Sequence, residues 1–239
     1  MFFRLNNSKP LTAIELTRVK AKSLEQFKEL ATHDLVELAV TDKGRAKYFH
    51  ENLVMQAWGL CFAEDEDFSF ETRIFRRIIE AAEVTREQSE MLSKCFDIIH
   101  AMYQSYDLSD KLDKKIAKKL TTRTHLVSLT KVIMAAVDKD VDVRLLAEWA
   151  KMFFNGGTKT SIDADYNTAC GSGSARRDKI EARMNAIERH FARYVRIEHR
   201  STVDDSHLES EESPASEEDS APDEQPISEE LTDTSDDEA

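Results

Sequence analysis

The sequence predicts an all-α protein, a multi-helix bundle of about eight to ten helices followed by a disordered acidic tail. Two observations predict the bundle. Apolar residues recur at three- and four-residue spacing along most of the chain from Ala13 to Arg196, and Ser/Thr-x-x-Glu/Gln signatures precede several of these periodic segments. The distribution of charge predicts the tail. At most one strand is expected, in the first few residues.

The charge of the chain divides sharply near residue 200. From Ser201 to Ala239 there are 16 Asp and Glu and no Lys or Arg, which leaves 30 acids and 33 bases before Ser201. Three of the four prolines also lie in this acidic stretch. A segment with so few apolar residues cannot bury enough surface to offset its chain entropy. We therefore predict a helical domain at 1–198 and a disordered tail, rich in Ser, Glu and Asp, at 199–239.

Three capping boxes mark predicted helix starts. In such a box, a Ser or Thr hydroxyl accepts a hydrogen bond from the third helical amide, and the Glu or Gln at that position reaches back to the cap amide. The boxes are Thr12–Glu15, Ser23–Gln26 and Thr85–Gln88. The first predicts a helix from Ala13 to about Lys22, the second begins the next helix, and the third begins a long helix.

Three further helices are predicted between the second box and the third. A short apolar piece runs from Asp34 to Val40 and is closed by turn residues at 41–44. Residues 52–62 are apolar on nearly every side, which is typical of a helix buried on most faces. Residues 70–82 place four apolar side chains on an inward face: Ile74, Phe75, Ile78 and Ile79.

The second half of the chain continues the helical pattern. A short helix carries Leu112, Ile116 and Leu120 on one side and lysines on the other. Two apolar helices follow, marked by Leu126, Leu129, Ile133 and Val137, and by Leu145, Leu146, Trp149 and Phe153. Gly156 and Gly157 are expected to end the latter, and a loop rich in Gly, Ser and Thr to lead to a final helix at about 175–196, N-capped by Ser174.

The search for reactive or metal-binding motifs returns none. Asp138, Asp140 and Asp142 imitate the start of a calcium loop, but Val143 and Trp149 stand where the loop requires a glycine and an acid. Residues 156–160 share only their composition with a phosphate loop, and no His or Cys pair has zinc-ligand spacing. We therefore predict no catalytic residue, no metal and no cofactor.

Two segments carry clustered basic residues, which are candidate contacts for nucleic-acid phosphates. In the final helix the candidates are Arg176, Arg177 and Arg183, and in the shorter helix they lie at 111–119. The alternative is a solvated face with ion pairs between residues four apart. We favour the alternative for both, because acids such as Asp178 and Glu181 dilute the positive potential.

The compartment follows from three negative observations. The three cysteines (Cys61, Cys95 and Cys170) are odd in number and widely spaced, so we expect reduced thiols rather than disulfides. No apolar run approaches the ~20 residues that cross a bilayer, and the first residues do not form a signal peptide. We expect a soluble cytoplasmic chain with no membrane contact.

The opening stretch FFRLNNSKPLTAIEL resembles the motif Phe-x-x-Leu/Ile-Asn-x-Gly/Ser-x-x-Leu-Thr/Ser-x-x-Glu of the GmrSD-type, ParB/sulfiredoxin-like domain. That domain lies at the N-terminus of modification-dependent restriction enzymes and in uncharacterised proteins of bacteria, phages and plasmids. The residues that carry the resemblance are Phe3, Leu5, Asn6, Pro10, Leu11 and Glu15. Further along the chain only the layout of helices is similar.

The resemblance implies a domain without its reaction centre. In the family this motif follows a mixed α/β segment that bears Asp-Gly-Gln-Arg and is tied to nucleotide hydrolysis and restriction, and this chain has no Asp-Gly dipeptide. The chain is then expected to be the helical part, non-catalytic on its own and completed by a separate N-terminal half or another protein. Arg4, Asn6 and Lys9 would lie at the rim of the missing site, unless residues 6–8 simply form the turn into the first helix.

A second hypothesis needs no missing half. Here the chain is a stand-alone helical interaction module, or one associated with nucleic acid, and its acidic tail is an autoinhibitor that competes with nucleic-acid phosphates. The sequence leaves the two hypotheses open.

Overall fold

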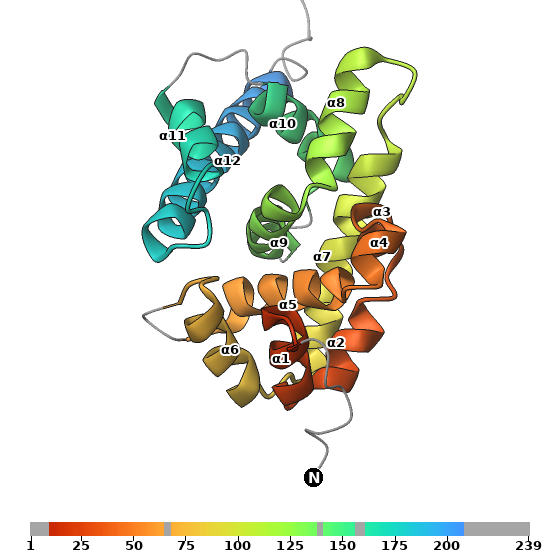
Figure 1. Cartoon of the computed structure of the whole chain (residues 1–239). Helices are drawn as coiled ribbons and strands as arrows, with labels where there is room; N and C mark the ends of the chain where they lie inside the picture. Colours follow the sequence, from red (N-terminus) through yellow and green to blue (C-terminus); the bar gives the residue numbers. More distant parts are fainter. Residues whose placement is uncertain (1–9, 65–67, 138–140, 156–160, 208–239) are drawn as a thin grey trace, which may run out of the picture. The chain divides into compact units, whose positions relative to one another are not determined.

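The computed structural model describes residues 10–64, 68–137, 141–155 and 161–207. The chain divides into two compact units, residues 1–199 and 200–239, and only 200–207 of the second are described, as part of a helix. The described residues form twelve helices and no strand, so the predicted all-α multi-helix bundle is confirmed (Figure 1).

The helices of the first half are mostly short. In chain order they are α1 Ala13–Lys20, α2 Leu24–Leu30, α3 Asp34–Ala39, α4 Asp42–Arg45, α5 Phe49–Phe62 and α6 Thr72–Ala81. The second half contains the longer ones: α7 Arg86–Gln104, α8 Lys111–Leu120, α9 Arg123–Val137, α10 Val143–Asn155, α11 Ser161–Ala169 and α12 Arg177–His207.

Helix α9 is the centre of the first unit, packed against both α5 and α7 (Figure 1). It is buried along most of its length, as is α5, which confirms that α5 has no broad polar face. Helices α1, α2, α3 and α6 pack around α5, whereas α8 and α10 pack on α7. The apolar stripe of α12 joins the same core through Ile180, Ile187 and Phe191.

Two of the three predicted capping boxes form, and the third is wrong. The hydroxyls of Thr12 and Thr85 accept from the amides of Glu15 and Gln88, whose side chains accept from the cap amides in return. The Ser23 hydroxyl does not cap α2. It donates to the carbonyl of Ala82 (2.9 Å) and accepts from the amide of Val84 (3.0 Å), because Ser23 is buried against the link between α6 and α7.

Three predicted boundaries need correction. Residues 41–44, expected as a closing turn, belong mostly to the one-turn helix α4, whose Gly44 amide is capped by the Thr41 hydroxyl. Residues 161–169, expected as loop, form α11, which the buried Tyr166 anchors to the core. The last helix begins at Arg177, not at a Ser174 cap, and it extends to His207.

The carbonyl of Ser174 explains the later start of α12, because it accepts a hydrogen bond from Arg183 (2.7 Å) instead of entering the helical ladder. The expected glycine cap at 156–157 and the acids Asp138 and Asp140 lie outside the described residues.

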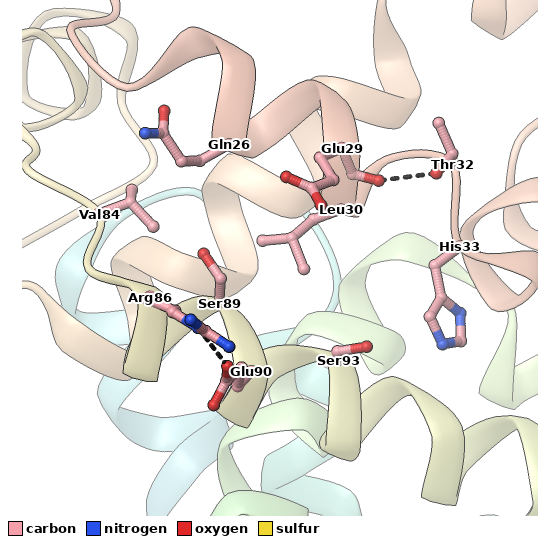
Figure 2. Close-up of a pocket in the computed structure, with 10 residues that line it drawn as sticks. All are labelled: Gln26, Glu29, Leu30, Thr32, His33, Val84, Arg86, Ser89, Glu90 and Ser93. Atoms are coloured by element: carbon pink, nitrogen blue, oxygen red, sulfur yellow. Dashed lines mark hydrogen bonds and ion pairs between the residues drawn. The ribbon is translucent and has the colours of Figure 1, made fainter.

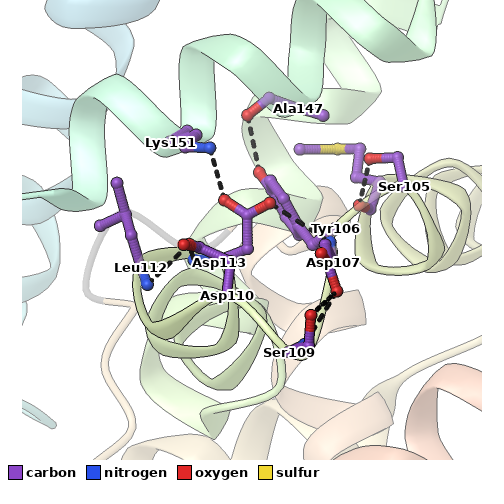
Figure 3. Close-up of polar contacts among 10 residues, drawn as sticks. Ser105, Tyr106, Asp107, Ser109, Asp110, Leu112, Asp113, Ala147 and Lys151 are labelled. Atoms are coloured by element: carbon purple, nitrogen blue, oxygen red, sulfur yellow. Dashed lines mark hydrogen bonds and ion pairs between the residues drawn. The ribbon is translucent and has the colours of Figure 1, made fainter.

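Polar contacts fasten α8 and the end of α7 to α10 (Figure 3). Lys151 of α10 pairs with Asp113 of α8 (2.5 Å), and the Tyr106 hydroxyl donates to the carbonyl of Ala147 (2.6 Å). Asp110 caps α8 by accepting from its second and third amides. Helix α8 is therefore held with one face against the bundle and the opposite face outward.

Candidate nucleic-acid interface

The outward face of α8 is a row of lysines. Because the residues on its apolar side recur every four positions, Ile116 and Leu120 are buried and Leu112 is half-buried. Four exposed lysines lie on the remaining surface: Lys111, Lys114, Lys115 and Lys118. We call these four residues the α8 lysine face.

No carboxylate within the described ranges pairs with the α8 lysine face. The acid of α8, Asp113, points toward α10 and pairs with Lys151, whose pKa it raises by accepting a hydrogen bond (Figure 3). The positive charge of the face is thus uncompensated within its own helix.

The predicted phosphate contacts of α12 lie in a different setting. Arg176 and Arg177 are exposed and pair with Asp178 (3.1 Å) and Glu181 (2.7 Å) of the same stretch. Exposed pairs of this kind contribute little to stability, but each must be broken or shared before the guanidinium can bind a phosphate. A phosphate contact by these two residues stays a prediction.

Arg183 is buried, with 2% of its surface exposed. Its Nη1 atom donates to the carbonyls of Ala169 (3.1 Å) and Ser174 (2.7 Å), which holds the link between α11 and α12 in place. Its Nε atom has no hydrogen-bond partner among the described residues. Burial lowers the pKa of this guanidinium.

Arg183 lines a cavity of about 120 Å³, which we call the α9 pocket. The polar residues around it come from four segments of the chain: Gln56, Arg123, Thr124, Ser174 and Arg183. Phe70, Val127 and Ala175 complete the lining. Of these polar residues the sequence predicted a binding role for Arg183 alone, and Ser174 was expected only as a helix cap.

A buried polar cluster lies beside the pocket. His125 Nδ1 is 2.9 Å from the Tyr166 hydroxyl, the two rings are stacked, and the Cys170 sulfur is 3.9 Å from the same nitrogen. Burial, with the charges of Lys119 and Arg183 adding to it, lowers the pKa of His125 to about 4. Burial also raises the pKa of Cys170.

These shifts argue against a reactive cysteine–histidine pair. A nucleophilic cysteine needs a lowered pKa, and its histidine a pKa near the working pH. Here both shifts run in the opposite direction, so His125 and Cys170 are neutral at pH 7 and the cluster is a structural one.

A hollow with a volume of about 660 Å³ lies between α2 and α7 (Figure 2). Two carboxylates, Glu29 and Glu90, and one guanidinium, Arg86, line it. Arg86 pairs with Glu90 (2.7 Å). Because acids outnumber bases, this hollow does not favour a phosphate ligand.

The family-motif residues lie mainly outside the described part of the chain, as Phe3, Leu5 and Asn6 do, together with the predicted rim residues Arg4 and Lys9. Of the others, Pro10 and Leu11 are exposed, whereas Glu15 caps the amide of Thr12 (2.7 Å). That amide is the main cause of the lowered pKa of Glu15.

Within the described residues, no group of three or more His, Cys, Asp or Glu side chains could hold a metal ion. No helix in those ranges has the length and apolar character needed to cross a membrane. Comparison with known proteins found no matching family model, curated protein or solved structure.

Proposed function

We propose that this chain is a helical module that associates with nucleic acid through the α8 lysine face. The observation that carries the proposal is the exposure of Lys111, Lys114, Lys115 and Lys118 without a carboxylate partner among the described residues. The contacts that hold α8 against α10 support it, because a helix already in place loses little backbone freedom on binding.

The driving force would be counterion release. Each lysine that neutralises a phosphate releases condensed cations from the nucleic acid, so affinity falls steeply with salt and depends little on sequence. The α8 lysine face consists of lysines alone, without the Asn, Gln or Arg side chains that form paired hydrogen bonds to base edges. This composition favours non-specific association through the phosphate backbone.

A salt titration of DNA binding tests the proposal. The triple variant Lys114→Gln, Lys115→Gln, Lys118→Gln should reduce the slope of log K against log [salt] by about 2 to 3, since each lost phosphate contact contributes about 0.9. The matched control removes three lysines that are paired with acids elsewhere: Lys20, Lys22 and Lys28. Fluorescence anisotropy with a labelled duplex measures both.

An equal change of slope in the two triple variants would show that net charge, not the α8 lysine face, governs binding, and the proposal would fail. The same titration with a chain ending at His207 tests the autoinhibition hypothesis, because that truncation removes most of the acids beyond Ser201. Autoinhibition requires tighter binding by the truncated chain, with the largest gain at low salt.

The resemblance of residues 2–16 supports a second proposal. The chain would be the helical part of a GmrSD-type domain linked to nucleotide-dependent DNA restriction, and it would be inactive without an Asp-Gly-Gln-Arg segment from elsewhere. The capping box of Thr12 and Glu15 favours this second proposal, because the box begins a helix at the position where the family motif places one. Coding DNA upstream of the Met1 codon should then encode that segment, and its absence there would weigh against this proposal.

A further inference from the structure

The strongest unassigned feature of the molecule is the α9 pocket. Its volume of about 120 Å³ is well below the several hundred Å³ of pockets that enclose drug-sized ligands. It can hold one small ion or a few waters but not a nucleoside. The chemistry of its walls therefore decides what it binds.

The walls carry two guanidinium groups and no carboxylate. Arg123 and Arg183 both line the pocket, and the remaining polar side chains are the neutral Gln56, Thr124 and Ser174. A buried charge is costly unless an opposite charge or a full set of hydrogen bonds compensates it. Arg183 is the buried one of the two and lacks that compensation, whereas Arg123 is exposed and places its charge at the edge of the cavity.

Arg183 is the decisive group. It is 2% exposed, its Nη1 is bonded only to the neutral carbonyls of Ala169 and Ser174, and its Nε lacks an acceptor among the described residues. The titratable groups that interact with Arg183 supply no negative charge, because burial raises the pKa of both Cys170 and Tyr166. A bound anion would supply both the acceptor that Nε lacks and the opposite charge.

The first turn of α9 adds donors to the same cavity. Arg123 and Thr124 begin this 15-residue helix and line the pocket, so its N-terminal end faces the cavity. The first amides of a helix have no acceptor within it, and the helix dipole favours an anion there. The hydroxyls of Thr124 and Ser174 provide further hydrogen bonds.

We propose that the α9 pocket binds one phosphate group of the monoester type, with Arg123 and Arg183 as its charged ligands. Guanidinium groups and helix amides form charge-assisted hydrogen bonds to tetrahedral oxyanions. A monoester presents three free oxygens to such donors. An internal phosphodiester has only two, and the nucleic-acid chain continues from both of its bridging oxygens, which a small cavity does not accommodate. The phosphate can belong to free inorganic phosphate or to the end of a nucleic-acid strand.

Calorimetric titration with inorganic phosphate at constant ionic strength tests the site. The native chain should bind phosphate, and Arg123→Gln should weaken binding by about tenfold or more, the effect of losing one charge-assisted hydrogen bond. Arg144→Gln is the matched control, since Arg144 is an exposed arginine of α10 that does not line the pocket. An Arg123 variant that binds as tightly as this control would overturn the proposal.

A second variant distinguishes a loss of phosphate binding from a loss of the fold. Thr124→Val removes a hydroxyl without a charge and should weaken phosphate binding by a smaller factor, with an unchanged circular dichroism spectrum. Arg183 is unsuitable as the only test because it also holds the α11–α12 link. Absence of phosphate binding by the folded native chain would sink the inference directly.

Binding of oligonucleotides with and without a 5′-phosphate distinguishes the two sources of the phosphate. If the ligand is a strand end, a 5′-phosphorylated oligonucleotide should bind more tightly than its hydroxyl-ended twin, and Arg123→Gln should abolish the difference. If the ligand is free phosphate, the twins should bind alike while inorganic phosphate still binds. The α8 triple variant should keep phosphate binding in either case, so a failure of the lysine face and a failure of the pocket give different results.

Discussion

Helices α8 and α12 are both rich in basic residues, yet these residues differ in their exposure and in their ion pairs. In α8 the lysines lie exposed, and the acid of the helix is turned toward Lys151 of α10. At the start of α12 the exposed Arg176 and Arg177 pair with Asp178 and Glu181, and Arg183 further along is buried. A count of basic residues therefore says less about a binding surface than the positions of the acids between them.

The physical reason is the helical period. Glu181 lies four residues after Arg177, so the two side chains meet on one face and the pair forms locally. Asp113 shares the inner side of α8 with Ile116, which takes it away from the exposed lysines. Substitutions in both helices, and in the packing behind them, test whether this difference matters for stability and binding.

The largest effect is expected from Arg183→Met. Loss of this side chain leaves the carbonyls of Ala169 and Ser174 without their donor, and each unsatisfied buried acceptor costs ~1–3 kcal/mol, so we expect a loss of about 4 kcal/mol in unfolding free energy. Urea denaturation measures it. Arg177→Met, an exposed arginine of the same helix, should change stability by no more than about 0.5 kcal/mol. Equal effects would show that burial does not distinguish the two arginines.

The next largest effect concerns pH and His125, which lies between Lys119 and Arg183. Burial lowers its pKa from 6.5 to about 4, so between these values the unfolded chain binds a proton that the native chain does not. Stability must therefore fall as the pH drops through that window, by about 3 kcal/mol from this residue.

The variant His125→Gln removes the titrating ring and should flatten the dependence of stability on pH between 6.5 and 4. The control for the substitution itself is His100→Gln, at a half-buried histidine of α7. Thermal melts across the range provide the measurement. A slope that survives in His125→Gln would place the titrating group elsewhere.

The capping boxes show how far the sequence predicts the structure. Helix starts at Thr12 and Thr85 were predictable because a capping box is a contact between residues three apart. The box at Ser23 failed because a partner 59 residues away, Ala82, competes for the same hydroxyl. Contacts that depend on the packed bundle leave no local pattern in the sequence.

The α9 pocket illustrates the same limit. Its two arginines, Arg123 and Arg183, are 60 positions apart, and Gln56 lies still further away on α5. Helix α11 was missed because its segment is polar and short, and the burial of Tyr166 and Ala169 in the packed structure stabilises it as a helix. Sequence periodicity predicts which helices exist, whereas their packing decides which charges meet.

The third largest effect is expected when α8 is given an acid among its lysines, as α12 has among its arginines. Lys118→Glu places an acid four residues after Lys114 and three after Lys115, so it removes a cation and pairs two others. DNA affinity at low salt should fall by about tenfold or more, and the salt slope should decrease by about 2. Lys28→Glu, the same charge change on α2, is the control, and an equal loss there would reduce the effect to net charge.

The smallest effect is expected from the reverse change in α12. Asp178→Asn with Glu181→Gln removes the partners of Arg176 and Arg177 while keeping side-chain size. If pairing is what keeps these arginines from phosphate, the double variant should bind DNA a few-fold more tightly and add about 1 to 2 to the salt slope. Asp165→Asn with Glu148→Gln changes charge equally at two exposed acids of α11 and α10. If both double variants gain the same affinity, long-range potential alone explains the gain, and the local pairing that distinguishes α12 from α8 has no role in binding.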